Sequence, residues 1–169
     1  KKRVEKVTIA QVDEYNKPIP GTELDYPCDT LLFSVGLIPD NELSRHAGVQ
    51  LSPVTNGPVV NQRLETSIPG VFACGNVLHV HDLVDFVSLE GEAVGRAAAA
   101  YIQNGCQDAA HGQTVPIVAG DGVRYTVPSL LRTADPDSPV TLRFRVRERS
   151  WDRSVCIYAD DTCIYRQRK

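Results

Sequence analysis

The sequence predicts an α/β fold followed by a small module of antiparallel strands, and three observations support this. A short apolar run at 71–74 is typical of a strand buried in a parallel sheet. After a glycine turn, an alanine-rich helical pattern continues to about residue 104. Beyond residue 112, short β-branched runs alternate with turn residues at a spacing of roughly 10–20 residues, which indicates antiparallel strands.

The composition is that of a globular protein. The chain has 169 residues, of which 42% are hydrophobic and 23% charged, with a net charge of −3. No apolar run approaches the roughly 20 residues of a membrane span, and the basic start at 1–3 is not followed by an apolar signal segment. The five cysteines include no Cys-x-x-Cys pair, which favours reduced thiols and a cytoplasmic location.

The first sixty residues predict short elements. Residues 4–12 and 29–35 have the apolar and β-branched content of strands, and Pro/Gly turn residues separate them. Helix-start residues at 39–42 predict one short helix that ends near Ala47. Residues 58–61 predict a further short strand. The segment before residue 28 has the character of the end of a β-meander.

The rest of the chain is organised around residues 66–104. The strand at 71–74 runs into Gly75-Asn76, and a helical pattern begins near Asp85. The helix is indicated by residues that repeat at i+4 spacing and by a glycine at the position that ends a helix: Leu89, Ala93, Ala97, Tyr101 and Gly105. A strand, a glycine turn and a helix N-terminus together form a place for an anion or a polar cofactor.

Two motifs carry a resemblance to a known family. Thr66-x5-Phe72-Ala73-x-Gly75-Asn76 resembles the second FAD-binding motif of the two-dinucleotide-domain FAD/NAD(P)-dependent pyridine nucleotide-disulfide oxidoreductases, the thioredoxin-reductase-like superfamily. Upstream, Ser34-x-Gly36-x-x-Pro39 resembles the strand of that family at which the chain returns from the NAD(P)H domain to the FAD domain. A strand–turn–helix with a capping asparagine in an unrelated α/β protein is the alternative, but two motifs in the right order favour the family.

The resemblance implies a set of cofactor-binding residues and a domain order. The FAD contacts would be Gly36, Gly75, Asn76, Val84 and Asp85, with Asn76 at a position where the family usually has aspartate. Residues 1–27 would end the β-meander of the NAD(P)H domain, and 28–105 would be the C-terminal part of a Rossmann-like FAD-binding domain. Residues 113–169 would be the small all-β module.

The family's Gly-x-Gly-x-x-Gly units, which bind dinucleotide pyrophosphates, are absent from these residues, and the nearest match at 120–122 is a turn. The resemblance therefore implies the C-terminal part of an enzyme that transfers hydride between NAD(P)H and a substrate through FAD. We expect the piece alone to be inactive and the strands at 29–35 and 71–74 to expose their edges. Its partners would be the remainder of the flavoenzyme, a partner subunit or a second copy. No residue is assigned as catalytic acid, base or nucleophile.

His79, His81, Asp82 and Asp85 have a metal-like spacing, but no cysteine or third histidine lies nearby in sequence. We therefore interpret 79–85 as a structural loop or a flavin-edge loop in which His81 or Asp85 tunes the flavin, and expect no metal. Cys74, inside the predicted core strand, is expected to be an inert buried thiol.

The C-terminal part is basic. Residues 1–140 hold 10 Lys/Arg against 17 Asp/Glu, whereas residues 141–169 hold 8 against 4. Alternate arginines at 143–149 share one face of a strand, but Phe144 lies on the other face, which argues against a nucleic-acid site. A solvated face, or a surface against an acidic partner such as residues 1–140, is favoured. We expect Trp151 to fill the core of the β module. The alternative function is a non-catalytic scaffold that docks a partner subunit through this basic module.

Overall fold

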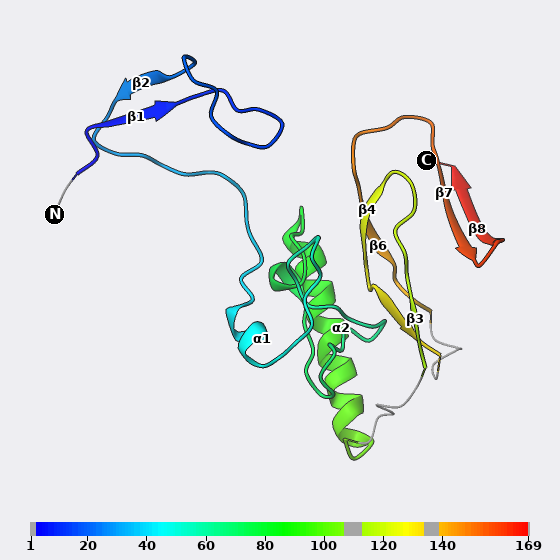
Figure 1. The fold of residues 1–169 in the computed structure, drawn as a ribbon. Helices are drawn as coiled ribbons and strands as arrows, with labels where there is room; N and C mark the ends of the chain where they lie inside the picture. Colours follow the sequence, from blue (N-terminus) through cyan, green and yellow to red (C-terminus); the bar gives the residue numbers. More distant parts are fainter. Residues whose placement is uncertain (1–2, 107–112, 134–138, 169) are drawn as a thin grey trace. The chain divides into compact units, whose positions relative to one another are not determined.

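A computed structural model describes residues 3–106, 113–133 and 139–168 of the chain (Figure 1). The chain forms two compact units, residues 1–36 and 37–169. The three-part domain assignment remains a prediction, since residues 113–168 fall in the same compact unit as the long helix.

The first unit is a β-hairpin. Strand β1 (Lys6–Ile9) pairs antiparallel with β2 (Leu24–Pro27). Asp25 on β2 accepts hydrogen bonds of 2.6 Å from both Lys6 Nζ and Thr8 Oγ1 across the pair. The strand predicted at 4–12 is therefore present in a shorter form.

The predicted strand at 29–35 is not formed. Residues 29–35 have no strand partner among the described residues, and Leu32, Phe33 and Val35 are 88%, 76% and 81% exposed. At 71–74, the structure has only an isolated antiparallel bridge between Glu65 and Phe72. An apolar sequence indicates that a segment tends to be buried. A strand also needs a neighbouring strand to pair its N–H and C=O groups, and these segments have none among the described residues. The described residues thus contain no parallel sheet, and the α/β fold class is seen only as helices with small antiparallel strand pairs.

The second unit begins with the predicted short helix, α1 (Glu42–His46). Asn41 precedes it and is buried, but its side chain does not cap the helix. Its Nδ2 group instead donates to the carbonyl oxygens of Asn56 at 3.0 Å and Val77 at 2.7 Å. Asn41 therefore links the start of α1 to the chain at Asn56 and at Val77.

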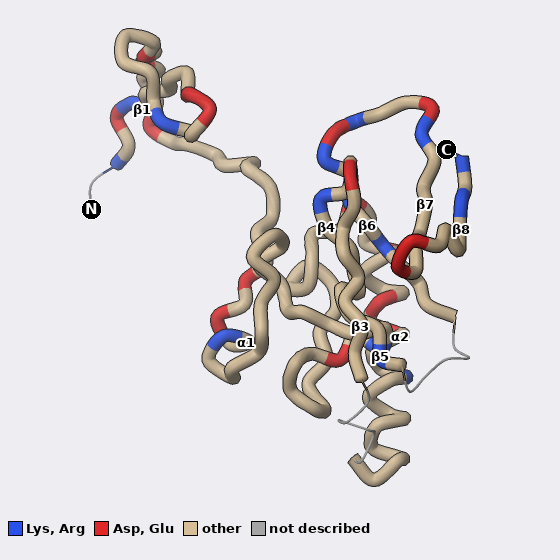
Figure 2. Tube along the Cα trace, turned by 45° about the vertical axis from the view of Figure 1, so that its right-hand side comes forward, with Lys and Arg blue, Asp and Glu red and all other residues tan. Residues whose placement is uncertain are grey.

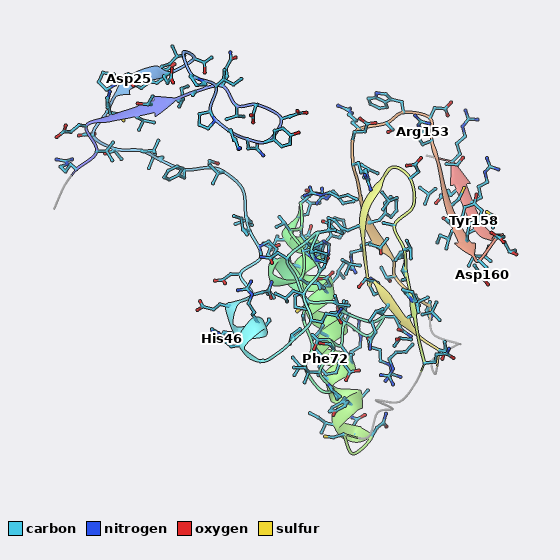
Figure 3. The ribbon with its side chains drawn as sticks, in the orientation of Figure 1. Asp25, His46, Phe72, Arg153, Tyr158 and Asp160 are labelled. Carbon is cyan, nitrogen blue, oxygen red and sulfur yellow. The ribbon has the colours of Figure 1, made fainter. Side chains whose placement is uncertain are left out.

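The long helix predicted by the alanine-rich segment is α2 (Val84–Gln103), preceded by a 3-10 turn, η1 (Gly75–Val77). Gly105 follows the helix with φ +69°, as expected of the residue that ends a helix. Of the residues that repeat at i+4, Ala97 and Tyr101 are partly buried and Ala93 is exposed. Leu89 is 54% exposed, whereas Glu90 is the buried residue of α2. At the far end, Tyr101 packs edge-on against Phe72, with ring centroids 6.1 Å apart. Figure 3 labels Phe72.

The predicted β module is present as antiparallel pairs. The pairs are β3–β5, β4–β6 and β7–β8, in which the strands are β3 (Thr114–Pro116), β4 (Val123–Val127), β5 (Leu130–Arg132), β6 (Arg143–Val146), β7 (Ser154–Ala159) and β8 (Thr162–Arg168). Each pair is two-stranded, and no single sheet joins them within the described ranges. Trp151 was expected to plug a core, which is wrong: it is 74% exposed, and the Arg149 guanidinium lies 4.4 Å from its ring centroid.

A small core joins the strand-rich segment to the loops around residues 60–78. Its buried apolar residues are Val60, Leu64, Ala73, Leu78 and Val127. Beside it, Arg132 Nη1 of β5 lies 3.1 Å from Glu65 Oε2, and both side chains are buried. The backbone N–H groups of Ser129 and Leu130 share the carbonyl of Val60. These contacts fix β4 and β5 against the loop that precedes η1.

Two glycines within α2 offer a first test. An added Cβ at Gly91 or Gly95 would meet nothing within 4 Å. Glycine in a helix interior costs roughly 0.5–1 kcal/mol relative to alanine. We expect Gly95→Ala to raise the free energy of unfolding by about that amount in urea titration. Gly105→Ala is the matched control, since its φ of +69° disfavours any side chain; stabilisation there would contradict the account.

Candidate functional site

The predicted cofactor turn at Gly75-Asn76 is held rigidly against α2. Gly75 is buried with φ +70°, and a Cβ there would lie 3.2 Å from Val87 Cγ1. Its N–H group donates to Glu90 Oε2 at 2.8 Å. The side-chain oxygen of Asn76 accepts from the N–H of His81 at 3.1 Å. The turn therefore presents backbone and the Asn76 amide in a fixed arrangement.

Val84 and Asp85 form the first turn of α2. Leu83 is the N-cap residue and makes no side-chain capping bond, so the first N–H groups of the helix are not covered by a side chain. Val84 is 75% exposed, and Asp85 is exposed beside it. The structure thus brings Gly75, Asn76, Val84 and Asp85 into one unit around the start of α2. Gly36 ends the other unit, with φ +91° and open space around its Cα.

Glu90 is the centre of a buried charged cluster that the sequence analysis missed. Its side chain is fully buried on α2. His79 Nε2 lies 3.4 Å from Oε1 and His81 Nε2 lies 3.0 Å from Oε2. Arg143 Nη1 of β6 lies 3.4 Å from Oε1. We refer to Glu90, His79, His81 and Arg143 as the Glu90 cluster. The sequence signal for this cluster is a charged residue within the helical segment. It could be used only if the buried face of the helix were known, and the sequence pattern does not show which face that is.

The cluster keeps Glu90 ionised. Burial by itself raises the pKa of this carboxyl, but hydrogen bonds from His79, the Gly75 N–H group and His81 outweigh it, and the charge interaction with His81 adds to them. The net effect lowers the pKa of Glu90 from 4.5 to about 2. The carboxylate is therefore a permanent negative charge beside the Gly75 turn.

This lowered pKa predicts a loss of stability in acid. The contribution of Glu90 is complete above its unfolded pKa of 4.5 and is lost as the pH falls toward about 2. Between pH 7 and pH 3, the stability advantage of the wild type over Glu90→Gln should shrink by about 2 kcal/mol. Urea unfolding at both pH values measures it. An advantage that is the same at pH 3 and pH 7 would contradict the ionised state of Glu90.

The carboxylates that the sequence suggested as metal partners lie elsewhere. Asp82 accepts two hydrogen bonds from Arg145 Nη1, at 3.1 and 2.9 Å, and Arg145 Nη2 donates to the Val80 carbonyl at 3.2 Å. Hydrogen bonding to Tyr125, and then to Asp82, raises the pKa of Arg145. Asp85 stays exposed on α2.

The basic face of β6 is therefore directed at acidic residues of the same chain. Arg143 pairs with Glu90 and Arg145 pairs with Asp82, so for these two arginines the structure favours the second of the two alternatives, a surface against acidic residues of 1–140. Figure 2 shows blue Lys and Arg positions on β6 and β8. Arg147 instead donates its Nε–H to the Val123 carbonyl at 3.3 Å.

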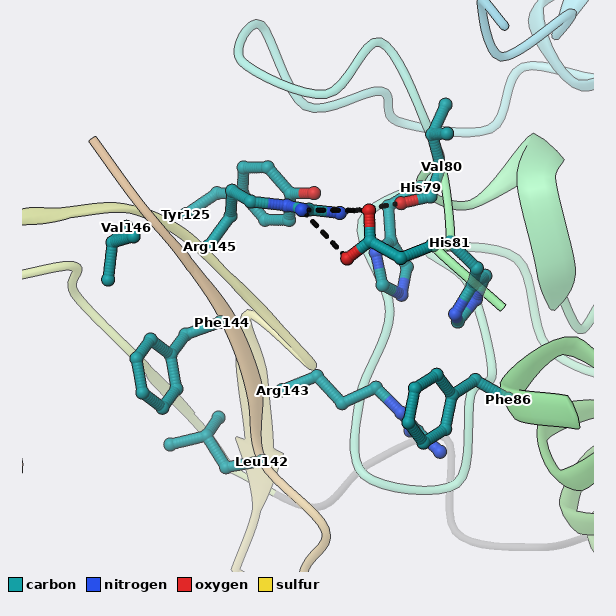
Figure 4. A pocket seen from close by; sticks show the side chains of 11 residues that line it. His79, Val80, His81, Phe86, Tyr125, Leu142, Arg143, Phe144, Arg145 and Val146 are labelled. Atoms are coloured by element: carbon teal, nitrogen blue, oxygen red, sulfur yellow. Dashed lines mark hydrogen bonds and ion pairs between the residues drawn. The ribbon is translucent and has the colours of Figure 1, made fainter. Parts of the chain in front are cut away.

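A cavity of about 390 Å³ lies between the 79–82 loop and β6 (Figure 4). Its lining includes both histidines of the cluster, two arginines and three aromatic rings: His79, His81, Arg143, Arg145, Phe86, Tyr125 and Phe144. The cavity combines cationic, imidazole and aromatic groups, so it can accept a polar group or ordered water.

Cys74 is partly buried against the core cluster, next to the Gly75 turn. Burial, with the nearby Glu90 charge, raises the pKa of its thiol above the ordinary value. The thiolate is disfavoured, which fits the prediction of an inert thiol.

The comparisons with known proteins identify the family. The model of the pyridine nucleotide-disulphide oxidoreductase family matches residues 1–105. The chain belongs to this family, as its two motifs predicted. No solved structure matches the chain. No helix in the described ranges is long and apolar enough to cross a membrane.

Curated relatives match over short stretches. The chain is 41% identical over 61 residues to the putidaredoxin reductase CamA of Pseudomonas putida, which is 36% of this chain and 13% of the relative. It is 38% identical over 56 residues to a nitric oxide reductase FlRd-NAD(+) reductase of Klebsiella pneumoniae, or 33% of this chain and 14% of that one. A longer match, 31% identical over 96 residues, covers 52% of this chain and 12% of the NADP(+)-dependent formate dehydrogenase subunit beta of Moorella thermoacetica. The matches thus span less than one sixth of these relatives.

Proposed function

We propose that the chain is part of a FAD-dependent NAD(P)H oxidoreductase and forms the side of the FAD site around the start of α2. The observation that carries the proposal is the Gly75-Asn76 turn, which is held by Glu90 of α2 and is followed, after residues 78–83, by a helix N-terminus without a side-chain cap. The family match and the reductase names of the relatives support the same reaction class. FAD supplies the hydride-transfer chemistry when bound, and the protein supplies binding and orientation.

The residues present fit this cofactor. Gly75 adopts the φ of +70° that the turn requires and so positions the following Asn76. Asn76 uses its oxygen on the His81 N–H group, while its Nδ2 group has no hydrogen-bond partner among the described residues and can donate to a ribityl hydroxyl. The N–H groups of Val84 and Asp85, at the positive end of the α2 dipole, suit an electron-rich carbonyl edge of the flavin. Gly36, in the other unit, belongs to the proposed set only through the family resemblance.

The proposal includes a larger protein. Pyrophosphate-binding glycine units and the NAD(P)H domain would come from sequence beyond these 169 residues, so we expect the 169-residue chain alone to be inactive. The domain order is then 1–27, 28–105 and 113–169, as the sequence suggested.

The formate dehydrogenase relative is named as a subunit, which supports a partner subunit for this protein as well. Five free cysteines are consistent with a cytoplasmic protein.

Asn76→Ala tests the proposal in the full-length protein that contains this chain. Loss of one neutral hydrogen bond, worth about 1 kcal/mol, should weaken FAD binding roughly fivefold in equilibrium dialysis. Asn104→Ala, at the exposed C-terminal end of α2, is the matched control and should bind as the wild type does. Equal FAD affinity in all three proteins would rule out Asn76 as a ligand.

A non-catalytic scaffold is the second candidate function. Arg143 and Arg145 form ion pairs within the chain, so they are less available to dock a partner than the sequence suggested. A full-length protein that binds no FAD but forms a stable complex with an oxidoreductase subunit would favour the scaffold.

A further inference from the structure

We propose that His79, His81 and Glu90 form a binding site for one divalent transition-metal ion of the Zn²⁺ type. Among the described residues, these three bring one ligand atom each, two imidazole nitrogens and a carboxylate oxygen, within 4.8 Å of one another. Two histidines and one carboxylate are a ligand set that suits Zn²⁺. The site goes beyond the proposed flavin role and does not depend on it.

The distances already approach those of a coordination sphere. Ligand atoms at about 2.0–2.1 Å from a tetrahedral ion lie about 3.3 Å from each other. His79 Nε2 and His81 Nε2 lie 3.4 and 3.0 Å from the nearest oxygens of Glu90. The two imidazole centroids are 4.1 Å apart. Small side-chain rotations are therefore enough to direct all three groups at one ion.

The local fold holds the ligands in place. The N–H groups of Leu78 and His79 both donate to the Gly75 carbonyl, and Leu78 is buried in the core. The N–H group of His81 donates to Asn76 Oδ1, and Glu90 lies on α2. Such preorganisation reduces the cost of ordering a metal site.

The protonation states suit a cation. His79 Nδ1 is buried and has no hydrogen-bond partner among the described residues, so no second bond locks the ring in one tautomer. The proton can therefore sit on Nδ1 and leave the Nε2 lone pair for the metal.

Arg143 is the competing cation. Its guanidinium lies 3.4 Å from Glu90 Oε1, and its side chain is 26% exposed on the cavity side. In the metal-free protein Arg143 neutralises part of the Glu90 charge. A bound ion would share the carboxylate with it or displace it. Three protein ligands leave a further coordination position, and because His79 and His81 line the cavity, water from the cavity can fill it.

Cobalt(II) substitution tests the site in the 169-residue chain. After removal of metal with a chelator, titration with Co²⁺ alone should give the visible bands of tetrahedral cobalt at one ion per chain, and Zn²⁺ should abolish them. His79→Ala and His81→Ala should each weaken binding at least tenfold, comparable with the 10–100-fold losses seen when the surroundings of metal ligands are altered. His46→Ala, which removes an exposed histidine of α1, is the matched control and should bind normally.

A variant that should bind the ion more tightly distinguishes loss of a ligand from loss of the fold. Arg143→Gln removes the competing charge but no ligand, so it should bind Co²⁺ more tightly than the wild type does. Zn²⁺ should also raise the thermal midpoint of the wild type and leave that of His81→Ala unchanged. Absence of saturable Co²⁺ binding in both wild type and Arg143→Gln, or equal affinity in wild type, His79→Ala and His81→Ala, would overturn the proposal.

Discussion

Replacing Glu90 with alanine is expected to lower the free energy of unfolding by about 3–5 kcal/mol, the usual cost of removing one partner from a buried charged pair. Glu90 is fully buried and binds two imidazoles, one guanidinium and the Gly75 N–H group. Its loss leaves Arg143 without its counter-ion and the Gly75 N–H group without an acceptor. Urea unfolding at pH 7 measures the effect.

Glu92→Ala is the matched control for this prediction. Glu92 lies two residues further along α2 with a 60% exposed side chain, and it pairs with Arg96 at the helix surface. Exposed pairs of this kind contribute about 0.5 kcal/mol or less. Equal losses in Glu90→Ala and Glu92→Ala would show that the Glu90 cluster does not stabilise the fold.

Gly57→Ala should be the most damaging of the glycine substitutions. An added Cβ would lie 1.8 Å from the carbonyl oxygen of Leu78 and 2.6 Å from its carbonyl carbon. These are backbone atoms of a buried residue, so no side-chain rotation relieves the overlap. We expect a loss of about 3 kcal/mol or more in the free energy of unfolding, measured by urea titration.

The substitution has a second expected effect, because Leu78 directly precedes His79. Moving the Leu78 carbonyl displaces the loop that carries both histidines, so Gly57→Ala should also weaken Co²⁺ binding. Gly95→Ala adds the same methyl group in open space and is the matched control. A stable Gly57→Ala protein would contradict the contact between the 57 and 78 loops.

Local signals in the sequence predicted the elements that need no distant partner. The alanine-rich composition predicted α2, and Gly105 predicted where it ends. Turn residues predicted the separation of the antiparallel pairs in the C-terminal part. The strand at 29–35 failed for the opposite reason. Its apolar residues indicate burial, but strand pairing depends on a neighbour that the sequence pattern does not specify.

The candidate site could also be predicted only in part, because some of its residues are brought together by distant contacts. The Gly75-Asn76 turn could be recognised from its motif, and His79 and His81 from their spacing. Their shared carboxylate could not, because the sequence pattern does not show that the charged Glu90 is the buried residue of α2. For the arginines of β6 the sequence left a solvated face and an acidic partner open, because the acids that Arg143 and Arg145 bind are brought near only by tertiary packing.

Amide hydrogen exchange of the full-length protein, with and without FAD, tests the central claim most directly. If the start of α2 forms one side of the FAD site, FAD should slow exchange at residues 75–85, while α1 at 42–46 should be unaffected. FAD that binds to the protein without protecting residues 75–85 would place the flavin elsewhere and contradict the proposed site.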